Sequence, residues 1–143
     1  MNIVSIESQG LVVTQGHQVP VEMFSELISN YEYQLFEEGY YKNGPTMAEF
    51  KISDFKKELL DVTIYIPVNA PVEEGENHKW IDHLKLESCL RKRTPFDEST
   101  EAALEEMKAY IDQEGLVYED RLILVFLRVF DEYWVDLLIP VKE

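Results

Sequence analysis

The sequence predicts a single α+β domain over residues 1–143, made from two copies of one βαββ unit. Two helical segments each end at a glycine, and strand-like segments follow each of them, the last closing on Ile-Pro-Val. The Glu-Gly pairs at 38–39 and 114–115 stand at almost the same distance from the Ile-Pro-Val that follows. Repeat one therefore covers about residues 1–70 and repeat two about residues 78–143. We expect one antiparallel sheet, with both helices on one face and a central groove on the other.

Two segments carry the apolar spacing of amphipathic helices. Residues 21–38 repeat apolar side chains every three or four positions, with Pro20 before the first turn and Gly39 at the position of a C-terminal cap. Residues 99–114 repeat the pattern and stop at Gly115. Each helix is expected to pack one apolar stripe against the sheet.

Outside the helices the apolar period falls to two, which is typical of strands. Strands are predicted at residues 11–19, 46–52, 59–68, 79–91, 121–130 and 133–141. Both alternating sets of side chains in 121–130 are largely apolar, so this strand is expected to be covered on its second face as well. The cover is a ligand pocket, a loop or another copy of the protein.

The composition excludes several classes of function. Cys89 is the only cysteine, and no cluster of Cys and His has the spacing of a zinc site, so neither a metal nor a cofactor is predicted. Against 13 Lys and Arg stand 28 Asp and Glu, and the formal charge of −15 repels phosphate backbones and anionic lipids. We expect a cytoplasmic protein that contacts neither membranes nor nucleic acid directly. The sequence leaves its oligomeric state open.

Alternation along the two matched final strands divides them into two faces. One face forms apolar rows that are expected beneath the helices: Val62, Ile64, Ile66 and Val68 in the first repeat, and Val135, Leu137, Ile139 and Val141 in the second. The opposite face combines aromatic and acidic side chains, which together hold organic cations. These candidate ligand-binding residues are Asp61, Thr63 and Tyr65 in one strand and Trp134, Asp136 and Leu138 in the other. If a pseudo-twofold axis relates the repeats, the two strands are expected to meet near the middle of the sheet.

Three further candidates lie outside these strands. His83 is expected on the groove side of strand 79–91. Alternation places Lys85, Glu87 and Cys89 beside it and puts Trp80, Leu84, Leu86 and Leu90 on the other side. Tyr40 and Tyr41 follow the first helix, where they are expected either to line the rim of the groove or to pack against the sheet edge. Cys89 and His83 lie roughly 20 Å apart on an extended strand at about 3.3 Å per residue, too far for proton transfer. No catalytic residue is assigned.

Two βαββ units that close on Ile-Pro-Val, each with a helix ending in glycine, resemble the GyrI-like (SOUL-like) effector-binding domains over nearly the whole chain. In that superfamily the groove between repeats binds amphipathic, often cationic, small molecules, and the domain occurs alone or attached to drug-sensing regulators. The resemblance implies a similar groove here. Asp136 stands at the acidic position before Ile-Pro-Val, where many members carry Glu, and Trp134 and Tyr65 stand at aromatic positions. Thr63 is the first-repeat equivalent of Asp136.

The length and the phrases Lys-Asn-Gly-Pro and Ile-Pro-Val are also similar to a stand-alone GyrI-like family of Gram-positive bacteria, which occurs near specialised secretion and toxin genes. Two functions follow as hypotheses. The first is a stand-alone, non-enzymatic domain that binds an amphipathic or cationic small molecule. The second is an acidic protein-interaction module, of the accessory, inhibitor or immunity type, for a toxin, a secretion component or gyrase. Hydrolysis by a groove carboxylate ranks last, because Asp136 has no visible second catalytic group.

Overall fold

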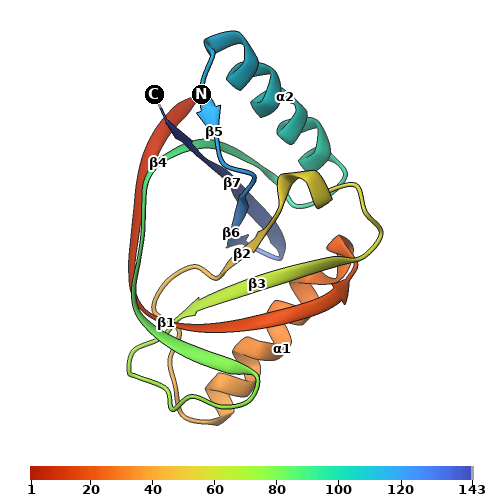
Figure 1. The fold of residues 1–143 in the computed structure, drawn as a ribbon. Helices are drawn as coiled ribbons and strands as arrows, with labels where there is room; N and C mark the ends of the chain where they lie inside the picture. Colours follow the sequence, from red (N-terminus) through yellow and green to blue (C-terminus); the bar gives the residue numbers. More distant parts are fainter. Residues whose placement is uncertain (143) are drawn as a thin grey trace.

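The computed structural model describes residues 1–142, and this part of the chain forms a strongly curved antiparallel sheet with two α-helices (Figure 1). Its elements are β1 (Asn2–Val19), η1 (Val21–Met23), α1 (Phe24–Glu37), β2 (Met47–Phe50), η2 (Ile52–Asp54), β3 (Leu60–Pro67), β4 (His78–Pro95), α2 (Ser99–Glu114), β5 (Val117–Tyr118), β6 (Leu122–Val129) and β7 (Glu132–Lys142). The predicted α+β class is confirmed. The strands β1 and β4 extend well beyond their predicted ends, and β5 was not predicted.

The strand order shows two βαββ units joined through β2 and β6, with β5 as an additional short strand beside β7. The order is β4-β1-β3-β2-β6-β7-β5, so β1, β3 and β2 of the first unit mirror β4, β7 and β6 of the second. The two units meet at the β2–β6 pair, where Met47 faces Val125. The expectation that the final strands β3 and β7 meet in the middle is therefore wrong, because β2 and β6 lie between them.

The sheet closes on itself through β4. This strand pairs with β1 from Asn2↔Arg91 to Thr14↔His78, and its last part pairs with β7 from Cys89↔Pro140 to Pro95↔Trp134. The long, curved strands β1 and β4 run side by side and join the two units along one side of the molecule (Figure 1). The closed sheet therefore has an inner face, which it encloses, and an outer face, which the helices cover.

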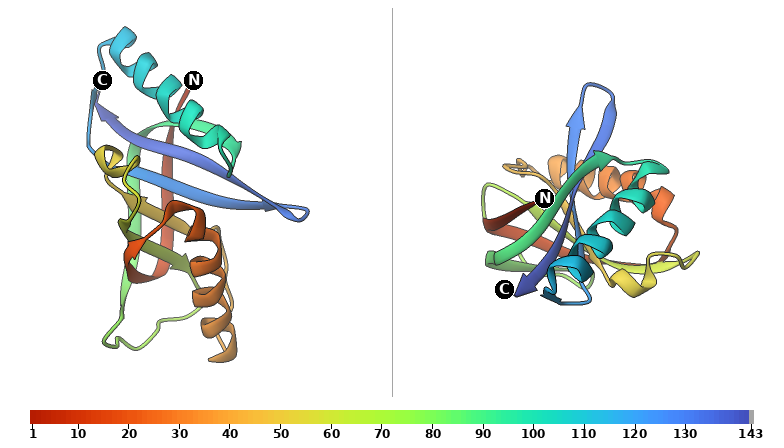
Figure 2. Two further views of the ribbon diagram at one scale, coloured as in Figure 1. Left: turned by 90° about the vertical axis from the view of Figure 1, so that its right-hand side faces the viewer. Right: turned by 90° about the horizontal axis from the view of Figure 1, so that it is seen from above.

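The main hydrophobic core lies between the outer face and both helices. Its helical members include Phe24 and Ile28 of α1 and Leu104, Met107 and Ile111 of α2. The two apolar rows predicted in β3 and β7 lie in this same core, from Val62 to Val68 and from Val135 to Val141. Both predicted helices therefore cover one face of the sheet, as expected (Figure 2).

A second, smaller cluster fills the inner face. It consists of Leu11, Met47, Leu86, Cys89, Ile123, Val125 and Leu138. Strand β6 contributes to both cores, because Leu122 and Leu124 pack outward while Ile123 and Val125 pack inward. The expected cover over the second face of this strand is thus the opposite wall of the closed sheet. It comes from the protein's own side chains.

The predicted faces of β4 are wrong. Trp80 and Leu90 pack against the outer core, whereas Leu84 and Leu86 join Cys89 in the inner cluster. The side chains of β4 thus change from one face of the sheet to the other along the strand, and its partner β1 has two irregularities in the same region. One is Gly10, which has a φ of +71°, and the other is the register shift between Val4 and Ile6. Simple alternation fails on a strand pair that bends through such irregularities.

We predict that Gly10→Ala destabilises the fold more than Gly115→Ala. Both glycines have positive φ, so each substitution adds about 1 kcal/mol of backbone strain. A Cβ at Gly10 would also lie 2.9 Å from the Trp80 indole, whereas nothing lies within 4 Å of one at Gly115. Overpacking of this kind costs about 1–3 kcal/mol. Urea unfolding of the two variants measures the difference, and equal losses of stability would contradict the close approach of Trp80.

Candidate functional site

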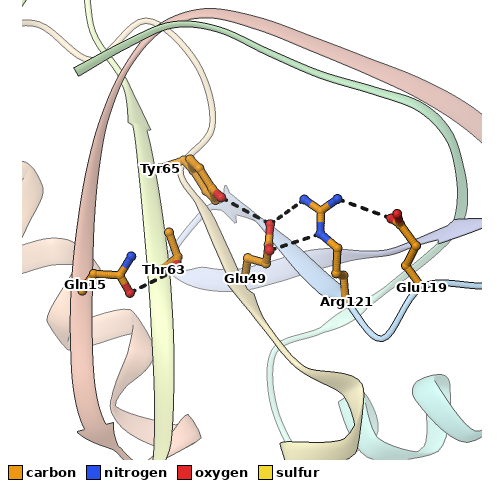
Figure 3. Close-up of polar contacts among 6 residues, drawn as sticks. All are labelled: Gln15, Glu49, Thr63, Tyr65, Glu119 and Arg121. Atoms are coloured by element: carbon orange, nitrogen blue, oxygen red, sulfur yellow. Dashed lines mark hydrogen bonds and ion pairs between the residues drawn. The ribbon is translucent and has the colours of Figure 1, made fainter. Parts of the chain in front are cut away.

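The inner face carries one carboxylate near the centre of the closed sheet, Glu49 of β2 (Figure 3). Its side chain is 21% exposed and accepts hydrogen bonds from Arg121, whose Nη2 lies 2.9 Å from Oε1 and whose Nε lies 3.2 Å from Oε2. The Tyr65 hydroxyl donates a third bond, at 3.3 Å, to Oε1. On its other side, Nη1 of Arg121 lies 3.4 Å from Glu119. Arg121 thus bridges an acid on the inner face and one that is half exposed.

The surroundings of Tyr65 and Arg121 keep both side chains protonated. Burial, together with the Glu49 carboxylate nearby, raises the pKa of Tyr65 to about 12. The hydrogen bond to Glu49 raises the pKa of the Arg121 guanidinium above its already high value. Tyr65 therefore remains a hydrogen-bond donor and Arg121 remains a cation at physiological pH.

Asp136 also lies on the inner face and is already bound to an arginine. Its buried carboxylate accepts bonds from Nε of Arg93 at 2.7 Å and from Nη2 at 3.0 Å. Arg93 is the cross-strand neighbour of Asp136 on β4. The predicted ligand-binding acid is therefore neutralised within the protein by a bidentate ion pair.

The two repeats hold different pairs at equivalent places. Gln15 faces Thr63 across β1 and β3, as Arg93 faces Asp136 across β4 and β7, and the Thr63 hydroxyl donates a 3.1 Å hydrogen bond to Gln15. On the other flank, Glu49 faces Thr63 and Val125 faces Asp136. Each repeat thus contributes one acid to the inner face, but from different strands. The acid of the first repeat comes from β2 and that of the second from β7.

Most of the predicted residues of the two final strands do share the inner face. Leu138 is buried in the inner cluster, and Tyr65 packs against it. Trp134 lies two positions from Asp136 on β7, opposite Leu127 and half-buried, near the hairpin end of the strand. Asp61 lies at the edge, where its exposed carboxylate accepts a hydrogen bond from the backbone N–H of Gln18 at 3.2 Å.

The structure does not bring the other three predicted residues to this face. His83 lies on the opposite side of β4 from its neighbour Leu84, with Nε2 2.6 Å from the Glu7 carboxylate. Tyr40 packs against the outer core, and Tyr41 is largely exposed. The placement of His83 reflects the change of side within β4. The two tyrosines follow α1, which covers the outer face.

Glu49 and Arg121 were missed by the sequence reasoning. They are 72 residues apart in the chain, and only the β2–β6 pairing brings their strands together. One signal is present in the sequence: Glu49 stands between the apolar Ala48 and Phe50 within the predicted strand 46–52. An acid in such a strand needs a partner.

A cavity of about 500 Å³, the mouth cavity, opens beside Arg121. Its lining combines the apolar Leu86, Cys89, Pro140 and Val141 with the charged Lys85, Glu87, Glu119, Arg121 and Lys142, together with Ser88. A larger cavity of about 710 Å³ lies on the outer side, between the beginnings of α1 and α2 and residues 55–57. Neither is lined by Trp134, Tyr65 or Asp136, and Tyr65 packs against the inner cluster instead. Of these two cavities, the mouth cavity adjoins the inner face, through Leu86 and Cys89.

The described residues, 1–142, also limit other kinds of site. Among them no three His, Cys, Asp or Glu side chains lie close enough together to hold a metal ion. None of their helices has the length and apolar character that crossing a bilayer requires.

The symmetric order of two βαββ units, with both helices on one face, is an architecture that this chain shares with solved structures. The crystal structure of the EcmrR C-terminal domain matches 99% of this chain and 98% of that chain, with a TM-score of 0.72 and 13% identity. In the cryo-EM structure of an EcmrR–DNA complex, the same likeness covers 57% of the EcmrR chain, with a TM-score of 0.73 and 12% identity. A Staphylococcus aureus protein described as a transcription regulation protein matches 99% of this chain at a TM-score of 0.51 and 16% identity.

At sequence identities of 12–16%, these structural matches show a shared fold. No protein-family model matches the sequence, and no curated protein does.

We predict that Cys89 is inert in the folded protein. It is fully buried, and burial raises the pKa of its thiol from 9.0 to about 11. At pH 8 this shift alone lowers the thiolate fraction about a hundredfold, and the thiolate is the reactive species. Reaction with Ellman's reagent should be slow in buffer and rapid in urea. A fast reaction of the native protein would show that the inner face opens to solvent far more than the structure indicates.

Proposed function

We propose that this domain binds a small amphipathic molecule whose cationic group enters the mouth cavity and takes the place of Arg121 at Glu49. The observation that carries the proposal is the position of Glu49. Its carboxylate lies among apolar side chains on the inner face, and Arg121, which neutralises it, also lines a cavity open to solvent.

Replacement of Arg121 by a ligand cation would leave the charge beside Glu49 unchanged. A carboxylate in such surroundings costs several kcal/mol of free energy unless a cation is bound to it, so Glu49 requires either Arg121 or a substitute. Arg121 is 34% exposed and already lies 3.4 Å from Glu119, which supplies a second acid to hold it when a ligand displaces it. Tyr65 would keep its hydrogen bond to Glu49 throughout.

The mouth cavity also suits the apolar part of such a ligand. A volume of about 500 Å³ lies within the usual range for small-molecule sites. Leu86, Pro140 and Val141 form the apolar part of its wall, each with only a small exposed area, and the fully buried Cys89 lies behind this wall in the inner cluster. A hydrophobic group placed there would be removed from water while the cation reaches Glu49.

The fold supports a binding role in general. The EcmrR domain that shares it belongs to a protein seen in complex with DNA. Because the present chain has a formal charge of −15, we infer that its own role is to bind the ligand and that it does not contact DNA. We propose no hydrolytic activity, since Asp136 and Glu49 are each held by an arginine and neither is free to act as a base.

The acidic surface of α2 is a weaker candidate for binding a basic protein. Glu101, Glu105, Glu106 and Asp112 were expected to lie on its exposed side as a charged face. Three of these acids lie within 4.0 Å of lysines of the same chain: Glu101 and Glu105 near Lys56, Glu105 also near Lys108, and Glu106 near Lys92. Much of the charge on this helix is thus balanced locally.

We predict that rhodamine 6G or a benzyl-substituted quaternary ammonium compound raises the melting temperature of the domain. A ligand at about a hundred times its dissociation constant adds about 2.7 kcal/mol to the free energy of unfolding, which corresponds to a rise of several degrees. Glu49→Gln should abolish the rise, because the amide does not require a cation. Arg121→Gln should enlarge it, because Glu49 is then left without its internal partner. Differential scanning fluorimetry measures each shift against the same variant without ligand.

Glu101→Gln on the exposed side of α2 is the matched control and should leave the ligand-induced rise unchanged. A rise of equal size in wild type and in Glu49→Gln would contradict binding at the inner face and would favour the larger outer cavity. The absence of any rise with both compounds would contradict the cationic ligand.

A further inference from the structure

The hairpin between β6 and β7 extends beyond the rest of the sheet (Figure 2). Strand β6 pairs with β2 as far as Val125, and β7 pairs with β4 from Trp134 onward. Beyond these positions the two strands pair with each other, as far as Val129↔Glu132. The residues 129–132, the hairpin tip, therefore project from the body of the protein without a supporting strand on either side.

The hairpin tip exposes Phe130 almost completely. Its side chain is 94% exposed, compared with 45% for the neighbouring Val129. A phenylalanine in this position contributes almost nothing to the core, because the hydrophobic contribution to folding scales with the apolar area removed from water. The stability of the isolated domain does not account for it.

The backbone at Phe130 is also unfavourable. Its φ is +57°, a region that glycine adopts readily and that is rare for a bulky side chain. A two-residue hairpin loop with positive φ at its first position normally has glycine there. Phe130 therefore combines backbone strain with an exposed apolar side chain. Strain of this kind is concentrated at functional sites.

We infer that the hairpin tip is a docking element that inserts Phe130 into an apolar pocket, bordered by basic side chains, on a separate protein. Large aromatic side chains dominate the binding energy of protein interfaces when a pocket surrounds them. Asp131 and Glu132 lie beside Phe130 and are both exposed, which favours a basic border around that pocket. The charge of −15 on each copy opposes self-association, so a second copy of this chain is the less favourable partner.

The docking element is independent of the proposed ligand site. Glu49 on β2 and Arg121 both lie at the end of β6 that is remote from the tip, since Glu49 faces Ile123 and Arg121 precedes Leu122. A failure of ligand binding would therefore leave the docking inference intact, and the reverse also holds.

The test begins with a photo-crosslinking phenylalanine analogue placed at position 130 of the full chain. A protein cross-linked from this position in an extract of the cells that make the domain is then purified and titrated with wild type, Phe130→Gly and Phe36→Ala. Phe36 on α1 is the matched control, because it is another exposed phenylalanine, at 63%, on a different surface. Thermal unfolding of each variant is measured in parallel.

Docking predicts that Phe130→Gly weakens binding of the purified partner at least tenfold, that Phe36→Ala does not, and that higher salt weakens binding to wild type. The melting temperature of Phe130→Gly should be no lower than that of wild type, because glycine relieves the strain, so the loss would not reflect unfolding. Three results would overturn the inference: no adduct beyond that obtained from position 36, an adduct between two copies of this chain, or equal affinity of Phe130→Gly and wild type.

Discussion

The pairing of β4 with both β1 and β7 is the constraint on which the rest of the structure depends. Without it, the six main strands would form an open sheet with one face in water. With it, the inner face is enclosed, and Leu11, Met47 and Leu138 can pack there as a second core. The helices need only cover the outer face, which explains why α1 and α2 both contribute to one cluster.

Because the inner face is enclosed, a charged group on it requires a partner of opposite charge. Glu49 and Asp136 lie where an unpaired carboxylate is unfavourable, and each is neutralised by an arginine from another strand or loop. The two pairs differ in what adjoins them. Arg93 is 55% exposed and pairs with Asp136 across the β4–β7 ladder, whereas Arg121 is 34% exposed and lines the mouth cavity. A ligand cation would therefore compete with the protein's own arginine, and the proposed affinity is a difference between two ion pairs.

Local patterns predicted the elements and the faces of the regular strands, and they failed where pairing is long-range. The spacing in α1 and α2 and the alternation in β3 and β7 were sufficient, because these elements run without interruption. The faces of β4 were not predictable, since they depend on irregularities in its partner β1, at Gly10 and before Ile6. The acid of the second repeat, Asp136, was placed on the correct face, but the sequence gives no sign that Arg93 binds it. Glu49 was not predicted as a site residue, because only the pairing of β2 with β6 brings it close to Arg121.

The central claim is that Glu49 depends on Arg121 as its internal cation, and a double-mutant cycle in urea tests it most directly. The account predicts that Glu49→Gln and Arg121→Gln each destabilise the domain, and that the double variant loses less than the sum of the two. The coupling free energy should be on the order of 1–3 kcal/mol, because each single variant leaves a partly buried polar group without its partner. Additive losses in the double variant would show that the two side chains do not stabilise each other, and would contradict the account.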